Sequence, residues 1–216
     1  MLIIDTSTEK LKVLLKTKNA IIENEETSSK HLKTLLPQID IAMQKANLKL
    51  GDIKTYCVVL GPGSFTGVRI GVSTVKAFLC VNKSAKVIGV NLLELIAFAI
   101  VKSVQPKNNF AIIIKSTARK YYFAVSNKDG KLQNQKMLTV AELDEFFKLN
   151  KMDLYSFNAE YKTEVVSAAK ISLLTQNYID FCEEKINKKE FSTDIKPIYL
   201  ALSQAEEELL KKQQAK

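Results

Sequence analysis

Four of the seven glycines in the chain fall within eleven residues, in the stretch GPGSFTGVRIG at 61–71. The stretch follows a continuously apolar run at 56–60 and precedes a segment rich in apolar residues, which predicts a strand, a tight turn and a helix. Backbone amides at such a helix start can receive a phosphate or another anion. Glycines there can equally permit a tight turn and close packing of the helix on its sheet. The residues alone favour neither interpretation.

The turn differs from the two common phosphate-binding motifs. It lacks the spacer and the Lys-Ser/Thr pair of a P-loop, and Thr66 stands where the dinucleotide fingerprint needs its third glycine. The stretch DTST at 5–8 follows the first apolar run, and its carboxylate and hydroxyls could hold a metal-bound phosphate or simply close a turn. The sequence therefore predicts at most weak phosphate or nucleotide binding, by Asp5, Ser7, Thr8, Gly61, Gly63 and Ser64.

One helix is expected before the 56–60 strand in the sequence, and another is expected after it. Apolar residues recur at spacings of three and four over 30–46, with Ser28 or Ser29 as the N-cap and Pro37 expected to bend the helix. The second helix, at 66–81, is apolar around most of its circumference, as is typical of a helix buried on more than one side. Its own sheet covers only one side, so we expect a second helix or another protein to cover the other.

The second half of the chain resembles the first after a shift of 110 residues. The apolar run at 2–4 then falls on 112–114, and Thr6-Ser7 falls on Ser116-Thr117. Self-similarity at this period predicts an α/β protein of two lobes that descend from one ancestral unit. We expect an N-terminal lobe at 1–105 and a smaller, degenerate lobe at 106–216. A terminal helix is expected near 203–212. The second half has no counterpart of the glycine-rich turn, and Lys115 matches Asp5. A one-sided site coordinates metal and phosphate poorly, which argues against independent nucleotide hydrolysis.

The composition offers few groups for catalysis. The chain has one histidine, His31, and three cysteines without CxxC spacing, which argues against a Cys/His zinc site and most nucleophilic mechanisms. The net charge of +9 is spread along the chain and comes mostly from lysines, a pattern more typical of a solvated surface than of a nucleic-acid footprint. Asp5 interrupts the apolar start, no run is long enough to span a bilayer, and unpaired cysteines fit a reducing compartment. We therefore expect a cytoplasmic protein without a membrane segment or a bound metal.

Several stretches resemble the TsaB (YeaZ) family: IDTST at 4–8, SSKH…LLP at 28–37, GPGSFTGVRIG at 61–71 and VIGVNLLELIA at 87–97. The later stretches STARKYY at 116–122 and KPIYLA at 196–201 are similar to the family's DARxxEVY and PxYLR motifs. Thr117 and Ala201 depart from these motifs, replacing an acid and an arginine. The resemblance implies the two-lobed actin-like ATPase (ASKHA) fold, with tandem RNase H-like lobes of which the second is degenerate.

The resemblance also implies a function. TsaB-like proteins are dimerisation and activating subunits of TsaD, which makes N6-threonylcarbamoyladenosine (t6A) at position 37 of tRNA; the ATPase TsaE joins them. Family members pack the first two helices as a bundle, in a heterodimer with TsaD or a homodimer without it. We therefore expect no independent catalysis, no cofactor beyond weakly bound nucleotide, and tRNA contact only through the complex. The expected interface residues are His31, Leu35, Gln38, Ile41, Arg69, Val72, Val75, Lys76 and Leu79.

Two other functions stay open at this point. One is a self-sufficient enzyme of the same superfamily, either ATP-dependent or metallopeptidase-like, although a peptidase needs metal ligands or an activated nucleophile. The other is a homodimeric regulator unrelated to tRNA. Arg69 could pair with a partner's carboxylate or extend into solvent.

Overall fold

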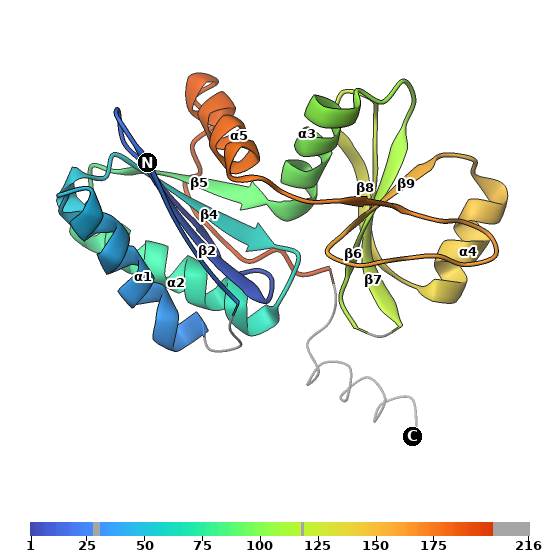
Figure 1. Cartoon of the computed structure of the whole chain (residues 1–216), viewed down its shortest axis with the longest axis horizontal. Helices are drawn as coiled ribbons and strands as arrows, with labels where there is room; N and C mark the ends of the chain where they lie inside the picture. The colour runs from blue at the N-terminus through green and yellow to red at the C-terminus, as the bar shows by residue number, and fades with distance from the viewer. Residues whose placement is uncertain (28–30, 118, 201–216) are drawn as a thin grey trace.

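The computed structural model describes residues 1–27, 31–117 and 119–200. Two five-stranded mixed sheets, each covered by helices, form the two lobes of the molecule (Figure 1). The strand orders are β3-β2-β1-β4-β5 and β10-β9-β6-β7-β8. In each sheet the central strand, β1 or β6, pairs antiparallel with the strand that follows it and parallel with a later one. The two sheets thus share one topology, which is what the sequence repeat predicts.

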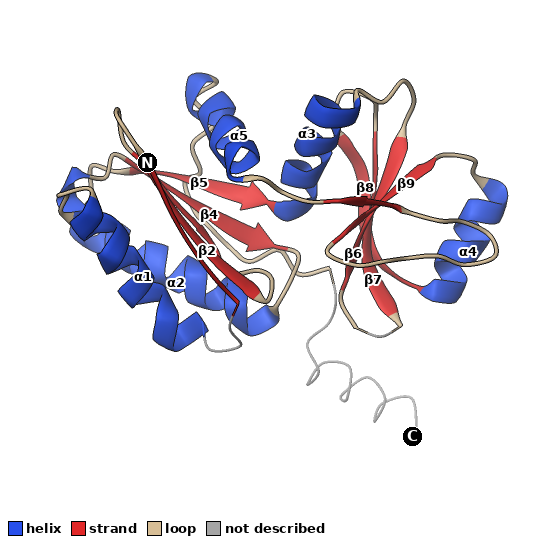
Figure 2. Ribbon diagram, viewed as in Figure 1, coloured by secondary structure: helices blue, strands red, loops and turns tan. Residues whose placement is uncertain are grey.

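The first sheet contains β1 (Leu2–Asp5), β2 (Lys10–Lys16), β3 (Ile21–Thr27), β4 (Thr55–Gly61) and β5 (Lys86–Asn91), followed by α3 (Leu92–Val104). Helices α1 (His31–Lys45) and α2 (Phe65–Val81) lie side by side on one face of it, and α3 lies on the other (Figures 1 and 2). Side chains of a strand alternate between the faces. Leu2 and Ile4 accordingly pack in the core under α1 and α2, whereas Ile3 packs in the core that includes α3.

The second sheet contains β6 (Phe110–Lys115), β7 (Lys120–Ser126), β8 (Leu132–Thr139), β9 (Asp153–Phe157) and β10 (Ala169–Ile171). Helix α4 (Val140–Leu149) begins at an N-cap, Thr139, whose hydroxyl accepts from the backbone amide of Glu142. It covers one face through Leu143 and Phe147. The opposite face packs on α3, so one core cluster contains residues of both sheets.

The chain then returns to the first lobe. Helix α5 (Thr175–Asn187) contacts α3 and β5, and Cys182 lies in the same core as Cys57 of β4. Residues 188–200 continue along the first sheet, where the amide of Ser192 donates to the Val87 carbonyl at 2.8 Å and that of Ile198 to the Leu60 carbonyl at 2.7 Å. Residues 175–200, assigned above to the second lobe, therefore pack on the first, because its exposed face requires cover.

The structure also bears on local expectations. The predicted helix at 66–81 is α2, and α1 continues through Pro37 to Lys45. The expected N-cap at Ser28 or Ser29, the substitution at Ala201 and the terminal helix at 203–212 lie outside the described residues. Among the helices of the described ranges, none combines the length and the apolar character needed to cross a membrane.

Candidate functional site

The glycine-rich turn packs directly on the turn that follows β1. A Cβ atom on Gly67 would lie 2.0 Å from the carbonyl oxygen of Thr6, and one on Gly63 would lie 2.2 Å from that of Ser7. The backbone amide of Ser64 donates to the same Ser7 carbonyl at 2.7 Å. The structure thus brings the two predicted phosphate motifs together, but it fills the space between them with backbone. Only glycine permits so close an approach.

Asp5 lies at the centre of this contact and is 2% exposed. Its Oδ1 accepts hydrogen bonds from the backbone amide of Ser7 at 2.8 Å and from the Ser7 hydroxyl at 2.6 Å. Its Oδ2 accepts from the hydroxyl of Tyr178, in α5, at 2.7 Å. Burial, and then the charge of Asp5, raise the pKa of Tyr178 well above its usual value, so this hydroxyl stays protonated as a donor.

These residues do not fit a nucleotide with its metal ion. Both oxygens of Asp5 are engaged within the chain, and the amide of Gly67 donates to the Ser64 hydroxyl at 3.1 Å. The hydroxyl of Thr8 donates to the carbonyl of Lys10, and Gly61 has a positive φ of 103° at the start of the turn. Within the described ranges there is no group of three or more His, Cys, Asp or Glu side chains that could hold a metal. The predicted phosphate-site residues instead join β1, α2 and α5.

The outer faces of α1 and α2 form a second candidate surface. Leu32 is 75% exposed, Leu36 is 55% and Ile41 is 40%, all on α1. The exposed residues of α2 are mostly polar or small: Phe65, Thr66, Arg69, Ser73, Lys76, Ala77, Cys80 and Val81. Exposed large apolar side chains that lie on one helix face make this surface a candidate for binding another protein.

The burial of α2 corrects one expectation. Val72 is 4% exposed and Val75 is fully buried, and both pack with Leu35 of α1 in the core above the first sheet. The valines of α2 are thus covered by α1 and the sheet, because these two helices lie side by side within one lobe. Leu35, Val72 and Val75 are unavailable to a partner, contrary to the prediction.

The other predicted interface residues, apart from the buried His31, lie closer to the surface. Ile41, Arg69 and Lys76 are exposed, and Gln38 and Leu79 are half-buried. His31 is 7% exposed, with its Nε2 atom 2.7 Å from the Thr8 carbonyl oxygen.

Sequence reasoning missed Leu32 and Leu36 as surface residues. They are four residues apart and lie at the edge of the apolar stripe of α1, which is too wide to be buried completely against the sheet. That width was visible in the sequence. Tyr178 was missed too, and no local signal links it to Asp5, which is 173 residues away.

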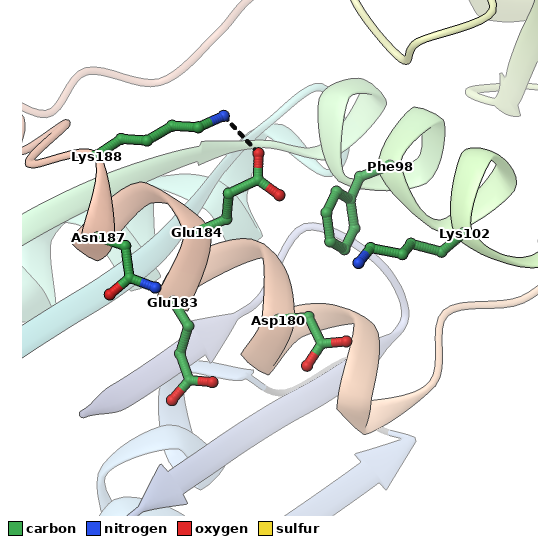
Figure 3. Close-up of a pocket in the computed structure, with 7 residues that line it drawn as sticks. All are labelled: Phe98, Lys102, Asp180, Glu183, Glu184, Asn187 and Lys188. Carbon is green, nitrogen blue, oxygen red and sulfur yellow. Dashed lines mark hydrogen bonds and ion pairs between the residues drawn. The ribbon is translucent and has the colours of Figure 1, made fainter.

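A hollow of about 450 Å³ lies between α3 and α5 and is lined by Phe98, Lys102, Asp180, Glu183, Glu184, Asn187 and Lys188 (Figure 3). Its carboxylates are already engaged by neighbouring side chains. Glu183 pairs with Lys16, Glu184 with Lys188 at 2.6 Å, and Asp180 accepts from the Gln176 amide. The three carboxylates of the hollow therefore all have partners within the described part of the chain.

The chain is similar in sequence to proteins of threonylcarbamoyladenosine synthesis. Residues 16–209 match the family described as "TsaD: tRNA N6-adenosine threonylcarbamoyltransferase". The TsaB protein of Buchnera aphidicola, named a tRNA threonylcarbamoyladenosine biosynthesis protein, is 25% identical over 93% of this chain and 97% of its own. The protein of the same name from Haemophilus influenzae is 33% identical, over 52% of this chain and about half (48%) of its own length.

The fold is shared with a solved structure, YeaZ from Pseudomonas aeruginosa. It superposes with a TM-score of 0.70 at 19% identity, over 92% of this chain and 98% of that one. The fold is therefore the two-lobed actin-like ATPase fold. With sequence and fold in agreement, the chain belongs to the tRNA N6-adenosine threonylcarbamoyltransferase family, among its TsaB (YeaZ) members.

Proposed function

We propose that this chain is a non-catalytic subunit of t6A biosynthesis, which binds and activates a TsaD-like transferase through the outer faces of α1 and α2. The observation that carries the proposal is the exposure of Leu32 and Leu36, 75% and 55%, beside the polar face of α2. Full burial of each leucine would contribute about 1.5–3 kcal/mol before the costs of association.

The geometry at Asp5 supports the proposed lack of catalysis. A metal-assisted transfer needs open carboxylates to hold the metal, whereas Asp5 shares its oxygens with Ser7 and Tyr178. The proposal therefore includes no resident cofactor, and it leaves nucleotide chemistry to the partners.

The names of the relatives support the proposed link to threonylcarbamoyladenosine synthesis. They associate TsaB proteins with threonylcarbamoyladenosine synthesis, and a transferase from Geotalea daltonii is 33% identical over 47% of this chain. We propose a cytoplasmic heterodimer with such a transferase, joined by a TsaE-like ATPase. In the absence of the transferase the chain forms a homodimer through the same helices, and it meets tRNA only within the complex.

The test is co-purification of Leu36→Glu with the TsaD-like protein of the same organism. A charge at this exposed position is expected to abolish the complex and leave the unfolding temperature within about 2 °C of the original, since surface substitutions change stability little. Leu149→Glu is the matched control, because Leu149 is 81% exposed at the end of α4 in the second lobe.

The same preparations then enter a tRNA modification assay, which should lose t6A with Leu36→Glu and keep it with Leu149→Glu. Binding that survives Leu36→Glu would contradict the proposed surface. ATP turnover by the chain alone, lost in Asp5→Asn, would support the self-sufficient enzyme instead.

A further inference from the structure

Arg69 on the exposed face of α2 is held from two sides. Its guanidinium carbon lies 3.8 Å from the centre of the Phe65 ring, and its Nε donates a 2.8 Å hydrogen bond to the hydroxyl of Tyr199. The rings of Phe65 and Tyr199 contact each other, with centres 4.9 Å apart. The three residues come from segments 130 positions apart, yet Phe65 and Tyr199 stay 39% and 45% exposed.

Within the described part of the chain, this arrangement leaves most of the N–H donors of the guanidinium without an acceptor. Arginine has five N–H donors, of which Tyr199 takes one, so roughly four remain. Among the described residues, Tyr199 provides the only hydrogen-bond acceptor for Arg69, and no carboxylate lies within ion-pair distance. Helix α2 contains no acidic residue, and the nearby Lys76 pairs with Asp194 at 3.3 Å. Considering the described residues, Arg69 therefore gives the exposed face of α2 an uncompensated positive charge and unused donors.

The choice of arginine is informative in this chain. Arg69 and Arg119 are the only arginines among 32 basic residues. A position that needed only positive charge would be served by lysine, whereas the planar guanidinium can stack on a ring and present two parallel donors.

We propose that Arg69, positioned by Phe65 and Tyr199, binds a carboxylate side chain of the protein that packs on α2. This inference rests on the proposed function and names the chemistry of the partner's contact. Fixing the guanidinium in advance reduces the side-chain entropy lost on binding, and a carboxylate can accept two of its parallel N–H groups. Tyr199 is thus a positioning residue, and it couples the segment at 188–200 to the partner surface.

The test compares binding of the TsaD-like protein to the full-length chain and to Arg69→Lys, Tyr199→Phe and Arg119→Lys. Arg69→Lys keeps the positive charge but loses the two parallel N–H donors of the guanidinium. It should therefore raise the dissociation constant by roughly tenfold or more. Tyr199→Phe keeps the ring and removes only the hydroxyl, so its effect should have the same sign and be smaller. Arg119→Lys is the matched control, an exposed arginine of the second lobe, and should bind as the original does.

Two readouts separate the carboxylate contact from a merely structural role. Binding of the original chain should weaken with added salt more steeply than binding of Arg69→Ala. Unfolding temperatures, measured in parallel, show whether a substitution weakens the contact between α2 and the segment at 188–200.

If Arg69→Lys lowers the unfolding temperature but binds the transferase as the original does, the cluster only joins that segment to α2 and the inference is overturned. If the original binds, Leu36→Glu does not and Arg69→Lys does, the proposed function stands without this contact. If the original chain itself does not bind the transferase, both the proposed function and the inference about Arg69 are overturned.

Discussion

At the residue scale, Asp5 shows how a carboxylate of catalytic appearance is used for structure. Burying an ionised carboxylate is costly unless hydrogen bonds replace its water. Asp5 receives three, two of them from Ser7 and one from Tyr178. The side chain of Lys12 lies 5.7 Å from the centre of the Tyr178 ring and adds a favourable cation–ring contact. The carboxylate therefore joins the end of β1 to α5.

Replacing Tyr178 by phenylalanine should reveal this role. Tyr178→Phe leaves Oδ2 of Asp5 buried without its donor, so the free energy of unfolding should fall by about 1.5–3 kcal/mol in urea denaturation. The control is Tyr122→Phe, whose hydroxyl donates to the uncharged Gly63 carbonyl at 3.2 Å. Tyr122→Phe should lower the free energy of unfolding by about 1 kcal/mol. Equal losses in the two variants would show that the charge of Asp5 is unimportant to the bond.

At the scale of elements, the glycines of α2 set the distance between the helix and the turn after β1. Gly67 and Gly71 are four residues apart and face the same turn, where a Cβ on Gly71 would lie 2.5 Å from the Thr6 hydroxyl oxygen. The helix can therefore lie close to the sheet and bury Val68, Val72 and Val75. The glycine cluster serves helix packing in this chain.

Adding one methyl group should separate the helix from that turn. Gly67→Ala places a Cβ 2.0 Å from the backbone oxygen of Thr6, which cannot move like a flexible side chain, so we expect a loss of at least about 1–3 kcal/mol of unfolding free energy. Gly51→Ala is the matched control, because a Cβ on Gly51 would have no neighbouring atom within 4 Å and the φ of this residue is not positive. Thermal unfolding of both variants provides the measurement. An unchanged unfolding temperature in Gly67→Ala would contradict the packing role.

At the scale of the whole molecule, the two lobes share one core. A single cluster contains Ile3 and Cys57 of the first sheet, Ile112 of the second, Ile96 of α3 and Ile179 of α5. Because α5 follows the second lobe in sequence but covers the first sheet, the first lobe is completed only after the second has been synthesised.

The fragment 1–105 should therefore fail to fold by itself. Without α5 and the second lobe, only α3 covers the face of the sheet that carries Ile3 and Cys57, so apolar area of this face and of α3 would be left in water. We expect the fragment to be insoluble, or to unfold without a cooperative transition in circular dichroism, whereas the full chain unfolds cooperatively. A cooperative transition in the fragment would show that the first lobe is independent.

Much of this organisation could be predicted from the sequence. The strand at 56–60 and the helix at 66–81 follow from local periodicity, and the two sheets of one topology follow from the repeat at a shift of 110 residues. The buried valines of α2 were mistaken for an interface because periodicity shows that a residue is apolar but does not show what covers it. The two predicted phosphate motifs had a similar gap, because the sequence could not show that they pack together or that the Tyr178 hydroxyl binds Asp5.

The sequence by itself determined the elements, their order and the glycines that permit close backbone contact, because backbone sterics and apolar spacing act over a few residues. The tertiary structure alone decided the partner of Asp5, the cover of α2 and the exposure of Leu36, because each depends on segments that meet only after the chain has folded.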